Sequence, residues 1–298
     1  MTDYVALRSH ELSDDTFSRF RELIYREAGI SLKESKKILL TNRLRKRLVA
    51  LQMDSYDEYY QFLLDTPEGR EKELLHFIDA VSTNETYFYR GDNQFEVLKD
   101  RVLPELFAKS DKVKIWSAGC STGEEPYTIA IVASEMAEAR RWDGTIDITA
   151  TDISTDVVDR ARTGVYRGRS LRFVPPAMLS KHFDALTDGY FRISDRMRDL
   201  IRFKRHNLLK DPLPGSYFNI IFCRNVIIYF DKPTQKHLMD NCFARALHRD
   251  GYLFIGHSES LIGTSDRFKY AHIMKTPIYR LLRPAEVKSS EEKRSADD

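Results

Sequence analysis

The chain has 298 residues, with 47 Lys and Arg against 45 Asp and Glu, which leaves a formal net charge of +2. Hydrophobic residues make up 42% of the chain, which is enough for a sizeable core and excludes global disorder. A charge so close to zero gives no sign of nucleic-acid binding by the chain as a whole. The length favours one large domain together with a small one.

Neither a secretory signal nor a membrane anchor is evident in the sequence. The first ten residues lack a basic start followed by an apolar run, and no stretch reaches the ~18 apolar residues that a spanning helix needs. Cys120, Cys223 and Cys242 stand far apart and lack the spacing of metal ligands, so we predict neither disulfides nor a metal site. The sequence therefore predicts a cytoplasmic, metal-free protein.

The first part of the chain, residues 1–82, shows helical patterns only. One helix is predicted over residues 33–51, and its apolar stripe consists of Ile38, Leu40, Leu44, Leu48 and Leu51. Further helices are predicted over residues 56–64 and from about 70 to 81. We therefore predict a small all-helical N-terminal domain.

From residue 112 onward, short β-rich runs alternate with helical ones. We predict strands over residues 113–117, 146–151, 201–206, 218–223, 252–256, 270–274 and 278–282. Helices are predicted over residues 125–139, 156–162 and 234–247. Such alternation is typical of an α/β fold with a doubly wound, mostly parallel sheet. The last two strands have no helix between them, so the sheet should end in an antiparallel hairpin.

The change of pattern places a domain boundary near residue 82. The second domain should extend over residues 83–283. Between about residues 166 and 200 the alternation gives way to Arg-rich, aromatic sequence, which we interpret as an insertion. The tail over residues 284–298 is charged and small, without an apolar run to anchor it, so we predict that it is disordered.

The strongest local signal is the sequence WSAGCSTGEEPY at residues 116–127, between a predicted strand and a predicted helix. Gly119 and Gly123 are four residues apart, which matches neither the dinucleotide pattern GxGxxG nor the phosphate-binding pattern GxxxxGK[ST]. Glu124 and Glu125, at the head of the helix, would repel a pyrophosphate. They suit a ligand with a cationic amino group and ribose hydroxyls, such as S-adenosylmethionine. A purely structural turn with capping acids is the alternative.

Polar residues follow three other predicted strands: Asp152 ends one, the sequence HNL at residues 206–208 ends another, and Arg224 and Asn225 follow a third. In open α/β sheets, ligands bind at the carboxyl ends of the strands, so these residues are predicted to face one crevice. The polar and aromatic sequence STNETYFYR at residues 82–90 lies at the domain junction. A capping role for Asp152 and an amphipathic linker at residues 82–90 are the alternatives.

Taken together, these segments resemble the CheR family of chemotaxis receptor methyltransferases, from about residue 10 to residue 282. Five motifs occur in order: TNxTxFxR, SAGCSTGEEPY, ATDIS, HNLL and FCRNVxIYF. The resemblance implies a class I methyltransferase fold that binds S-adenosylmethionine, with a small β-subdomain inserted near residues 166–200. It also implies transfer of a methyl group to glutamate side chains of chemotaxis receptors, which gives methyl esters for sensory adaptation and leaves S-adenosylhomocysteine.

The resemblance also implies roles for individual residues. Arg90 and Tyr229 would lie at the reacting end. The residues that would hold the cofactor are Asn84, Thr86, Arg90, Gly119, Glu125 (with Glu124 as the alternative), Asp152, Asn207, Leu208, Arg224 and Asn225. The implied partner is the cytoplasmic helical domain of receptors in membrane arrays. We expect a monomer that binds no nucleic acid and inserts into no membrane.

The helix predicted over residues 33–51 is strongly basic, with seven Lys and Arg against one acid, Glu34. We predict that four of its cations, Arg43, Arg45, Lys46 and Arg47, bind receptors. Receptor methylation helices are rich in Glu and Gln, so these cations would steer them electrostatically. A solvated helix face and an RNA phosphate backbone are the alternatives.

Some members of the family grip a peptide at the receptor's far C-terminus with a glycine-rich loop in the β-subdomain. Here the corresponding stretch, residues 188–200, contains only Gly189, and we predict a compact turn near residues 194–196. The sequence thus predicts an enzyme that works without this tether.

Two other functions of the whole chain are the alternatives to receptor methylation. One is a catalytically silent cofactor-binding module that contacts receptors, and the other is an RNA or DNA methyltransferase. Residues 223–226 lack the Asn/Asp-Pro-Pro-aromatic motif of base-amine methylation.

Overall fold

The computed structural model describes residues 11–273 and 276–282. The chain divides into two compact units. Unit 1 comprises Met1–Thr83, Ile153–Thr155 and Tyr229–Asp231, and unit 2 comprises Asn84–Asp152, Asp156–Ile228 and Lys232–Asp298. The predicted disordered tail lies outside the described residues. Within them, no helix is both long and apolar enough to cross a membrane.

Unit 1 is built from helices, as the sequence predicted. They are α2 (Asp14–Ala28), α3 (Lys37–Leu51), α4 (Tyr56–Asp65) and α5 (Leu74–Val81). The Ser13 hydroxyl caps α2 by accepting the Thr16 N–H at 3.0 Å, and Gly29 ends that helix in the left-handed conformation. The basic helix begins later than predicted, because residues Glu34–Lys36 form a 3-10 turn before α3.

Only part of the apolar stripe predicted for α3 lies in the core of unit 1. Leu40, Leu44 and Leu48 are buried, whereas Ile38 is 75% exposed, so the placement of Ile38 in one stripe with these leucines is wrong. An α-helix turns by about 100° per residue, which puts Ile38 on nearly the opposite face from Leu40. The sequence pattern therefore overestimated the width of the buried face.

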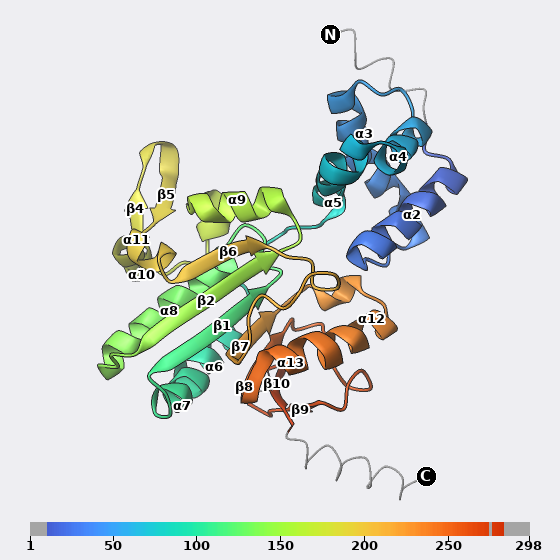
Figure 1. Ribbon diagram of the computed structural model, residues 1–298. Coiled ribbons are helices and arrows are strands. Elements are labelled where there is room, and N and C mark those ends of the chain that lie inside the picture. The colour runs from blue at the N-terminus through green and yellow to red at the C-terminus, as the bar shows by residue number, and fades with distance from the viewer. Residues whose placement is uncertain (1–10, 274–275, 283–298) are drawn as a thin grey trace, which may run out of the picture. The chain divides into compact units, whose positions relative to one another are not determined.

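Unit 2 is organised around a seven-stranded sheet with the strand order β6-β2-β1-β7-β8-β10-β9 (Figure 1). The strands are β1 (Lys112–Ala118), β2 (Thr145–Asp152), β6 (Ile201–Arg205), β7 (Phe218–Cys223), β8 (Leu247–Ile255), β9 (Phe268–Tyr270) and β10 (Ile278–Leu281). The first five strands in this order pair in parallel, whereas β10 pairs antiparallel with both β8 and β9. The predicted doubly wound sheet with a terminal antiparallel hairpin is confirmed.

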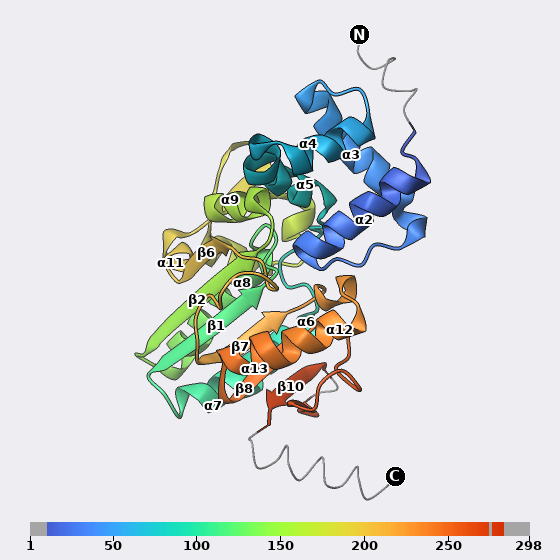
Figure 2. The ribbon, with the colours of Figure 1, turned by 45° about the vertical axis from the view of Figure 1, so that its right-hand side comes forward.

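Helices cover both faces of this sheet (Figures 1 and 2). Neighbouring residues of a strand point to opposite faces, so Ile115 and Trp116 of β1 belong to different layers. Trp116 packs edge-on against Phe243, in the helical segment before β8. Ile115 shares its cluster with side chains of α8 (Glu124–Arg140). Outside the insertion, further helices are α6 (Asp92–Val97), α7 (Leu103–Phe107), α9 (Thr155–Thr163), α12 (Lys232–His237) and α13 (Ala244–Ala246).

The insertion forms a separate antiparallel sheet with the order β3-β5-β4. Its strands are β3 (Val165–Arg167), β4 (Phe183–Ala185) and β5 (Tyr190–Ile193), and α10 (Pro176–His182) lies between the first two. The turn of the β4–β5 hairpin is Thr187–Gly189, where Asp188 and Gly189 have φ values of 59° and 71°. The turn predicted near residues 194–196 is wrong, because that stretch begins the short helix α11 (Asp195–Arg198).

Candidate functional site

The carboxyl ends of five parallel strands lie along one edge of the sheet, which we call the carboxyl edge. The strands that end there are β1, β2, β6, β7 and β8. Ligands of open α/β folds bind outside this edge, where the loops that follow the strands converge. The polar residues predicted to follow the strands are therefore brought to one side of unit 2.

The loop after β1 requires glycine at both predicted positions. Gly119 and Gly123 have φ values of 86° and 96°, in the left-handed region that favours glycine. A Cβ at Gly119 would lie 2.3 Å from Cγ2 of Val226, and one at Gly123 would lie 2.9 Å from the Tyr166 hydroxyl. The Gly119 N–H donates to the Thr151 carbonyl at 2.8 Å, so the loop folds over the end of β2.

Asp152 joins this loop to the segment predicted at the domain junction. Its Oδ2 accepts the Ser121 N–H at 2.8 Å, and the Ser121 hydroxyl donates to the Asn84 carbonyl at 3.0 Å. Asp152 is only 7% exposed, so its carboxylate lies in a low-dielectric setting where hydrogen bonds are strong. Three of the predicted segments thus converge around one buried carboxylate.

Glu125 holds a second buried charge at the head of α8. Its carboxylate accepts a hydrogen bond from the Ser117 hydroxyl at 2.8 Å and pairs with the Arg224 guanidinium at 3.1 Å. Another nitrogen of Arg224 donates to the Arg90 carbonyl, so three predicted site residues form one chain of contacts. Burial raises the pKa of Glu125, and Arg224 opposes that rise. Burial likewise lowers the pKa of Arg224.

Glu124 has different neighbours from Glu125. It accepts hydrogen bonds from the Thr122 hydroxyl at 2.6 Å and from the Ser170 hydroxyl at 2.8 Å. Burial raises the pKa of Glu124 as well. Glu124 therefore faces the inserted subdomain, whereas Glu125 faces the end of β7. Which of the two contacts the cofactor stays a prediction.

The residues after β6 extend the same edge. The His206 N–H donates to the Asp152 carbonyl at 2.7 Å, which brings the next residue, Asn207, beside the end of β2. Oδ1 of Asn207 accepts the Leu209 N–H at 3.0 Å, so the amide stabilises its own turn. Asn207 is buried and Leu208 is half-buried.

Comparisons with known proteins agree with this architecture. Residues 84–276 match the family model of the CheR methyltransferase SAM-binding domain, and residues 15–82 match that of the CheR all-alpha domain. The chain belongs to the CheR methyltransferase family. A chemotaxis protein methyltransferase of Borreliella burgdorferi is 38% identical over 261 residues, which cover 86% of this chain and 91% of the relative. Chemotaxis protein methyltransferase 2 of Pseudomonas aeruginosa is 40% identical, covering 84% and 88%.

Membership of the CheR family confirms the predicted fold, cofactor and class of reaction. Unit 2 contains the domain that binds S-adenosylmethionine, and the chain is an S-adenosylmethionine-dependent protein-glutamate methyltransferase of bacterial chemotaxis. The prediction of an enzyme, in place of a silent binding module or a nucleic-acid methyltransferase, is thus confirmed. The roles of the individual site residues stay predictions.

A residue of this CheR methyltransferase that sequence analysis missed is Glu259, which follows β8. Its carboxylate accepts the N–H groups of Asn225 at 3.0 Å and Ile228 at 3.2 Å, and also that of Gly256. Glu259 therefore holds the loop in which Asn225 adopts a φ of 59°. The other site residues were predicted because they are polar and follow a strand. Ser258 and Glu259 show the same pattern after β8.

The two residues predicted at the reacting end belong to different units. In unit 2, Arg90 is half-buried, its guanidinium donates to the Glu85 carbonyl at 2.7 Å, and Thr86 nearby in the sequence is also half-buried. In unit 1, the carbonyl of Tyr229 accepts the Ser31 N–H at 2.8 Å. These contacts describe how the three residues are held, and their catalytic or binding roles stay predictions.

The four cations predicted to bind receptors differ in their surroundings. Arg47 pairs with buried Glu73 at 2.6 Å, and that bond raises the pKa of Arg47. Arg43 donates to the Val81 carbonyl and to the Thr83 hydroxyl, and burial lowers its pKa. The other two cations, Arg45 and Lys46, are exposed. Receptor binding by the basic helix would therefore depend mainly on these two.

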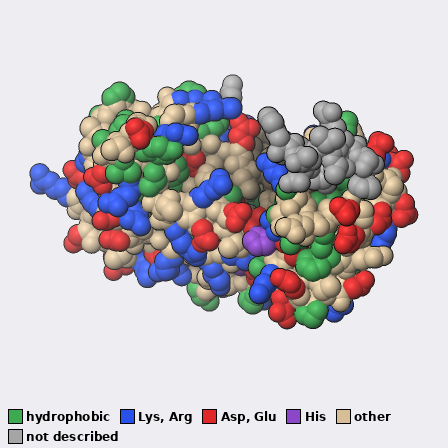
Figure 3. All heavy atoms as spheres, turned by 90° about the horizontal axis from the view of Figure 1, so that it is seen from above, with side chains coloured by type: hydrophobic (Ala, Val, Ile, Leu, Met, Phe, Trp, Pro, Cys, Tyr) green, Lys and Arg blue, Asp and Glu red, His purple; other side chains and the backbone are tan. Residues whose placement is uncertain are grey.

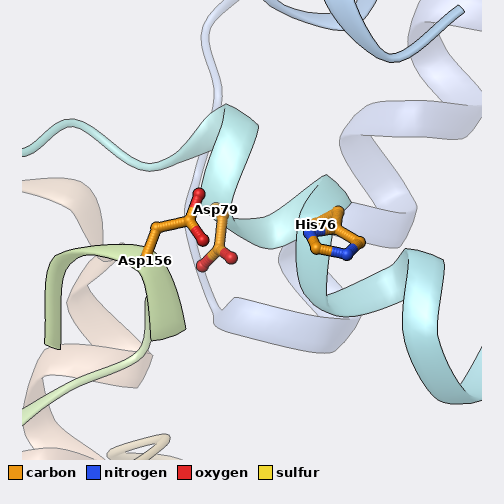
Figure 4. Close-up of side chains that lie close together, drawn as sticks. All are labelled: His76, Asp79 and Asp156. Atoms are coloured by element: carbon orange, nitrogen blue, oxygen red, sulfur yellow. The ribbon is translucent and has the colours of Figure 1, made fainter. Parts of the chain in front are cut away.

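Figure 4 shows three side chains with ligand atoms suited to a metal: His76 and Asp79 come from α5, and Asp156 comes from α9. His76 and Asp156 are exposed, and such exposed groups are common without an ion. Oδ1 of Asp79 accepts the Thr155 N–H at 2.9 Å within unit 1, which explains its position without a metal. We assign no ion to these side chains, and a metal-free enzyme stays a prediction.

Proposed function

We propose that the carboxyl edge of unit 2 holds S-adenosylmethionine through the residues described above. The observation that supports this most strongly is Asp152, a buried carboxylate bonded to the glycine loop at the end of β2. Carboxylates in this position hold ribose hydroxyls in other open sheets. The left-handed glycines let the backbone approach a ligand closely. Glu124 and Glu125 make the head of α8 unsuitable for phosphate and suitable for a cationic amino group.

The proposed chemistry needs no general base. A substrate glutamate has an unperturbed pKa of about 4.3, so at neutral pH it is already the nucleophilic carboxylate. When bound, S-adenosylmethionine supplies a methyl group activated by a positively charged sulfur. The family resemblance assigns Arg90 and Tyr229 to the orientation of this carboxylate, and a dry, aligned site favours a reaction in which opposite charges disappear. Neither residue would act as an acid or a base.

Arg90→Ala and Tyr229→Phe should therefore lower turnover more than cofactor affinity. A charged hydrogen bond contributes about 1.5–3 kcal/mol, which corresponds to roughly one to two decades in rate when it acts only in the transition state. Turnover is measured by transfer of labelled methyl groups to receptor cytoplasmic fragments, and affinity by calorimetry with S-adenosylhomocysteine. Arg196→Ala, on the exposed surface of α11, is the control. Equal losses of rate and affinity would assign both residues to cofactor binding instead.

We also propose that the protein substrate is the cytoplasmic helical domain of chemotaxis receptors. The exposed cations Arg45 and Lys46 on α3 would attract the acidic methylation helices of that domain. A monomer that acts in the cytoplasm at receptor arrays, without nucleic acid, is proposed on the family resemblance alone.

Arg45→Gln/Lys46→Gln is expected to slow methylation several-fold at low salt. Exposed charges are screened over about 8–10 Å at physiological ionic strength, so added salt should reduce the wild-type rate towards that of the variant. The measurement is the initial rate as a function of salt concentration. Lys99→Gln/Arg101→Gln removes two exposed cations from unit 2 and should leave the salt dependence unchanged. An unaltered rate for the Arg45/Lys46 variant would show that α3 is only a solvated face.

We further propose that this enzyme works without a receptor C-terminal peptide tether. The β4–β5 hairpin is joined by the four residues Leu186–Gly189, a loop too short to extend the sheet edge at which a captured peptide strand would pair. We expect no binding when the protein is titrated with a receptor C-terminal pentapeptide, and undiminished methylation of a receptor that lacks its tail. Micromolar peptide binding would contradict this proposal.

A further inference from the structure

Recognition of an anionic substrate by this chain must depend on local groups of cations. The formal net charge is only +2. On the face drawn in Figure 3, Lys and Arg side chains are intermingled with Asp and Glu. The cations on that face therefore do not form one large positive patch. A carboxylate would be bound selectively only where neighbouring side chains hold cations in place.

One such group lies in unit 2 around the ring of Tyr87, and we call Tyr87, Arg90, Arg172 and Phe173 the Tyr87 cluster. The guanidinium carbon of Arg172 lies 4.1 Å from the centroid of the Tyr87 ring and 4.7 Å from that of Phe173. The centroids of the two rings are 5.4 Å apart, and the guanidinium carbon of Arg90 lies 5.8 Å from the Tyr87 centroid. Two cations thus share one aromatic ring.

The cluster presents an available cation together with exposed apolar surface. Arg172 is exposed, and Phe173 is 49% exposed. Among the residues that the structure describes, Arg172 forms no ion pair, whereas its neighbour Arg169 pairs with Glu85 at 2.8 Å. An arginine stacked on aromatic rings loses part of its rotamer freedom in advance, while its N–H groups remain free to bind a carboxylate in a bidentate manner.

Hydrogen bonds also link the Tyr87 cluster to the proposed cofactor site. The Ser170 hydroxyl donates to Glu124 at the head of α8, at 2.8 Å. The carbonyl of Ser170 accepts the Phe88 N–H at 3.0 Å, which ties the turn before Arg172 to the segment that contains Tyr87. Both halves of the cluster are therefore held beside the carboxyl edge of the sheet.

The spacing of the two cations fits an acidic helix. Since Arg172 and Arg90 lie 4.1 and 5.8 Å from one ring centroid, their guanidinium carbons are no more than about 10 Å apart. On an α-helix, side chains three or four residues apart have Cβ atoms about 5–6 Å apart. The separation of two side chains one turn apart on a substrate helix is therefore compatible with this upper limit.

We propose that Arg172 binds an acidic side chain located one helical turn from the glutamate that becomes methylated. Tyr87 and Phe173 hold the guanidinium, and Arg90 receives the target carboxylate. This inference rests on the proposed function, and it adds a rule for site selection: glutamates with an acidic neighbour three or four residues away are methylated faster than isolated ones.

The test combines enzyme and substrate variants in a double-mutant cycle. Receptor fragments carry either Glu or Gln one turn from the methylated position. With the Glu fragment, Arg172→Gln should lower kcat/KM and fragment affinity about five- to tenfold, and Arg172→Lys should restore only part of the loss. With the Gln fragment, kcat/KM and affinity of the wild-type enzyme should fall to the values of Arg172→Gln with the Glu fragment. Arg172→Gln should lower neither quantity further with the Gln fragment. Affinity for S-adenosylhomocysteine should be unchanged.

The matched control is Arg167→Gln in the same subdomain. Arg167 is also exposed and lies 4.6 Å from the centroid of an aromatic ring, that of Tyr190. An equal fall for Arg167→Gln, or an equal effect of Arg172→Gln on both fragments, would overturn the assignment. Fragment binding is measured with S-adenosylhomocysteine present, so the result does not depend on turnover. Failure of wild type to methylate any fragment would count against the proposed function, separately.

Discussion

Replacing Arg224 by Met should destabilise unit 2 by about 3–5 kcal/mol, because the buried carboxylate of Glu125 would lose its partner. The side chains of Arg224 and Glu125 are 3% and 12% exposed, and they pair at 3.1 Å. An uncompensated charge is costly in such a setting, whereas the ion pair itself contributes much less. In a unit of this size, the expected fall in Tm is on the order of 10 °C. Thermal unfolding followed by circular dichroism measures it.

Two further variants separate the buried pair from a general loss of packing. Glu125→Gln combined with Arg224→Met removes both charges and should recover part of the stability lost in Arg224→Met alone. Arg280→Met is the control, because Arg280 pairs with Glu105 at 2.6 Å but its side chain is 39% exposed. Exposed pairs contribute only about 0–1 kcal/mol. A double variant less stable than Arg224→Met would contradict this account.

Asp152→Ala should weaken binding of S-adenosylmethionine by roughly 10- to 100-fold without unfolding the chain. The variant removes the carboxylate proposed to hold ribose hydroxyls, and charged hydrogen bonds contribute about 1.5–3 kcal/mol each. It also removes the acceptor of the Ser121 N–H, which holds the glycine loop. Calorimetric titration with S-adenosylmethionine and with S-adenosylhomocysteine measures the effect. An absence of heat from the wild-type protein with either ligand would contradict the cofactor site itself.

Conservative replacements separate the two roles of Asp152. Asp152→Asn keeps an acceptor for the Ser121 N–H but removes the charge, so affinity near that of wild type would show that the carboxylate mainly positions the loop. Asp147→Ala alters another acid of β2, which pairs with Arg202 at 2.5 Å towards the opposite end of the strand. Affinity for both ligands should be unchanged in Asp147→Ala. A comparable loss there would assign the effect to the stability of the strand.

Features with local causes were predictable from the sequence. The order of helices and strands in unit 2 follows from hydrophobic periodicity, and the confirmed mixed sheet follows from the missing helix before β10. The left-handed Gly119 and Gly123 and the strand-ending Asp152 were also identifiable, because backbone geometry and topology assign such residues to the carboxyl edge. The prediction misplaced the hairpin turn because Asp188-Gly189 and Ser194-Asp195 are both acceptable turn sequences. The pairing of β4 with β5 decided between them.

The tertiary structure alone decided which charged side chains lose contact with water and what they pair with. Arg47 appeared equivalent to Arg45 in the sequence, yet Glu73, 26 residues further along, pairs with Arg47. Glu125 and Arg224 meet although 99 residues separate them. Periodicity describes one element at a time, whereas desolvation depends on the neighbours that folding supplies. The sequence by itself therefore determined the fold and the family and predicted the edge proposed to hold the cofactor, whereas the packing of distant segments determined which cations stay exposed.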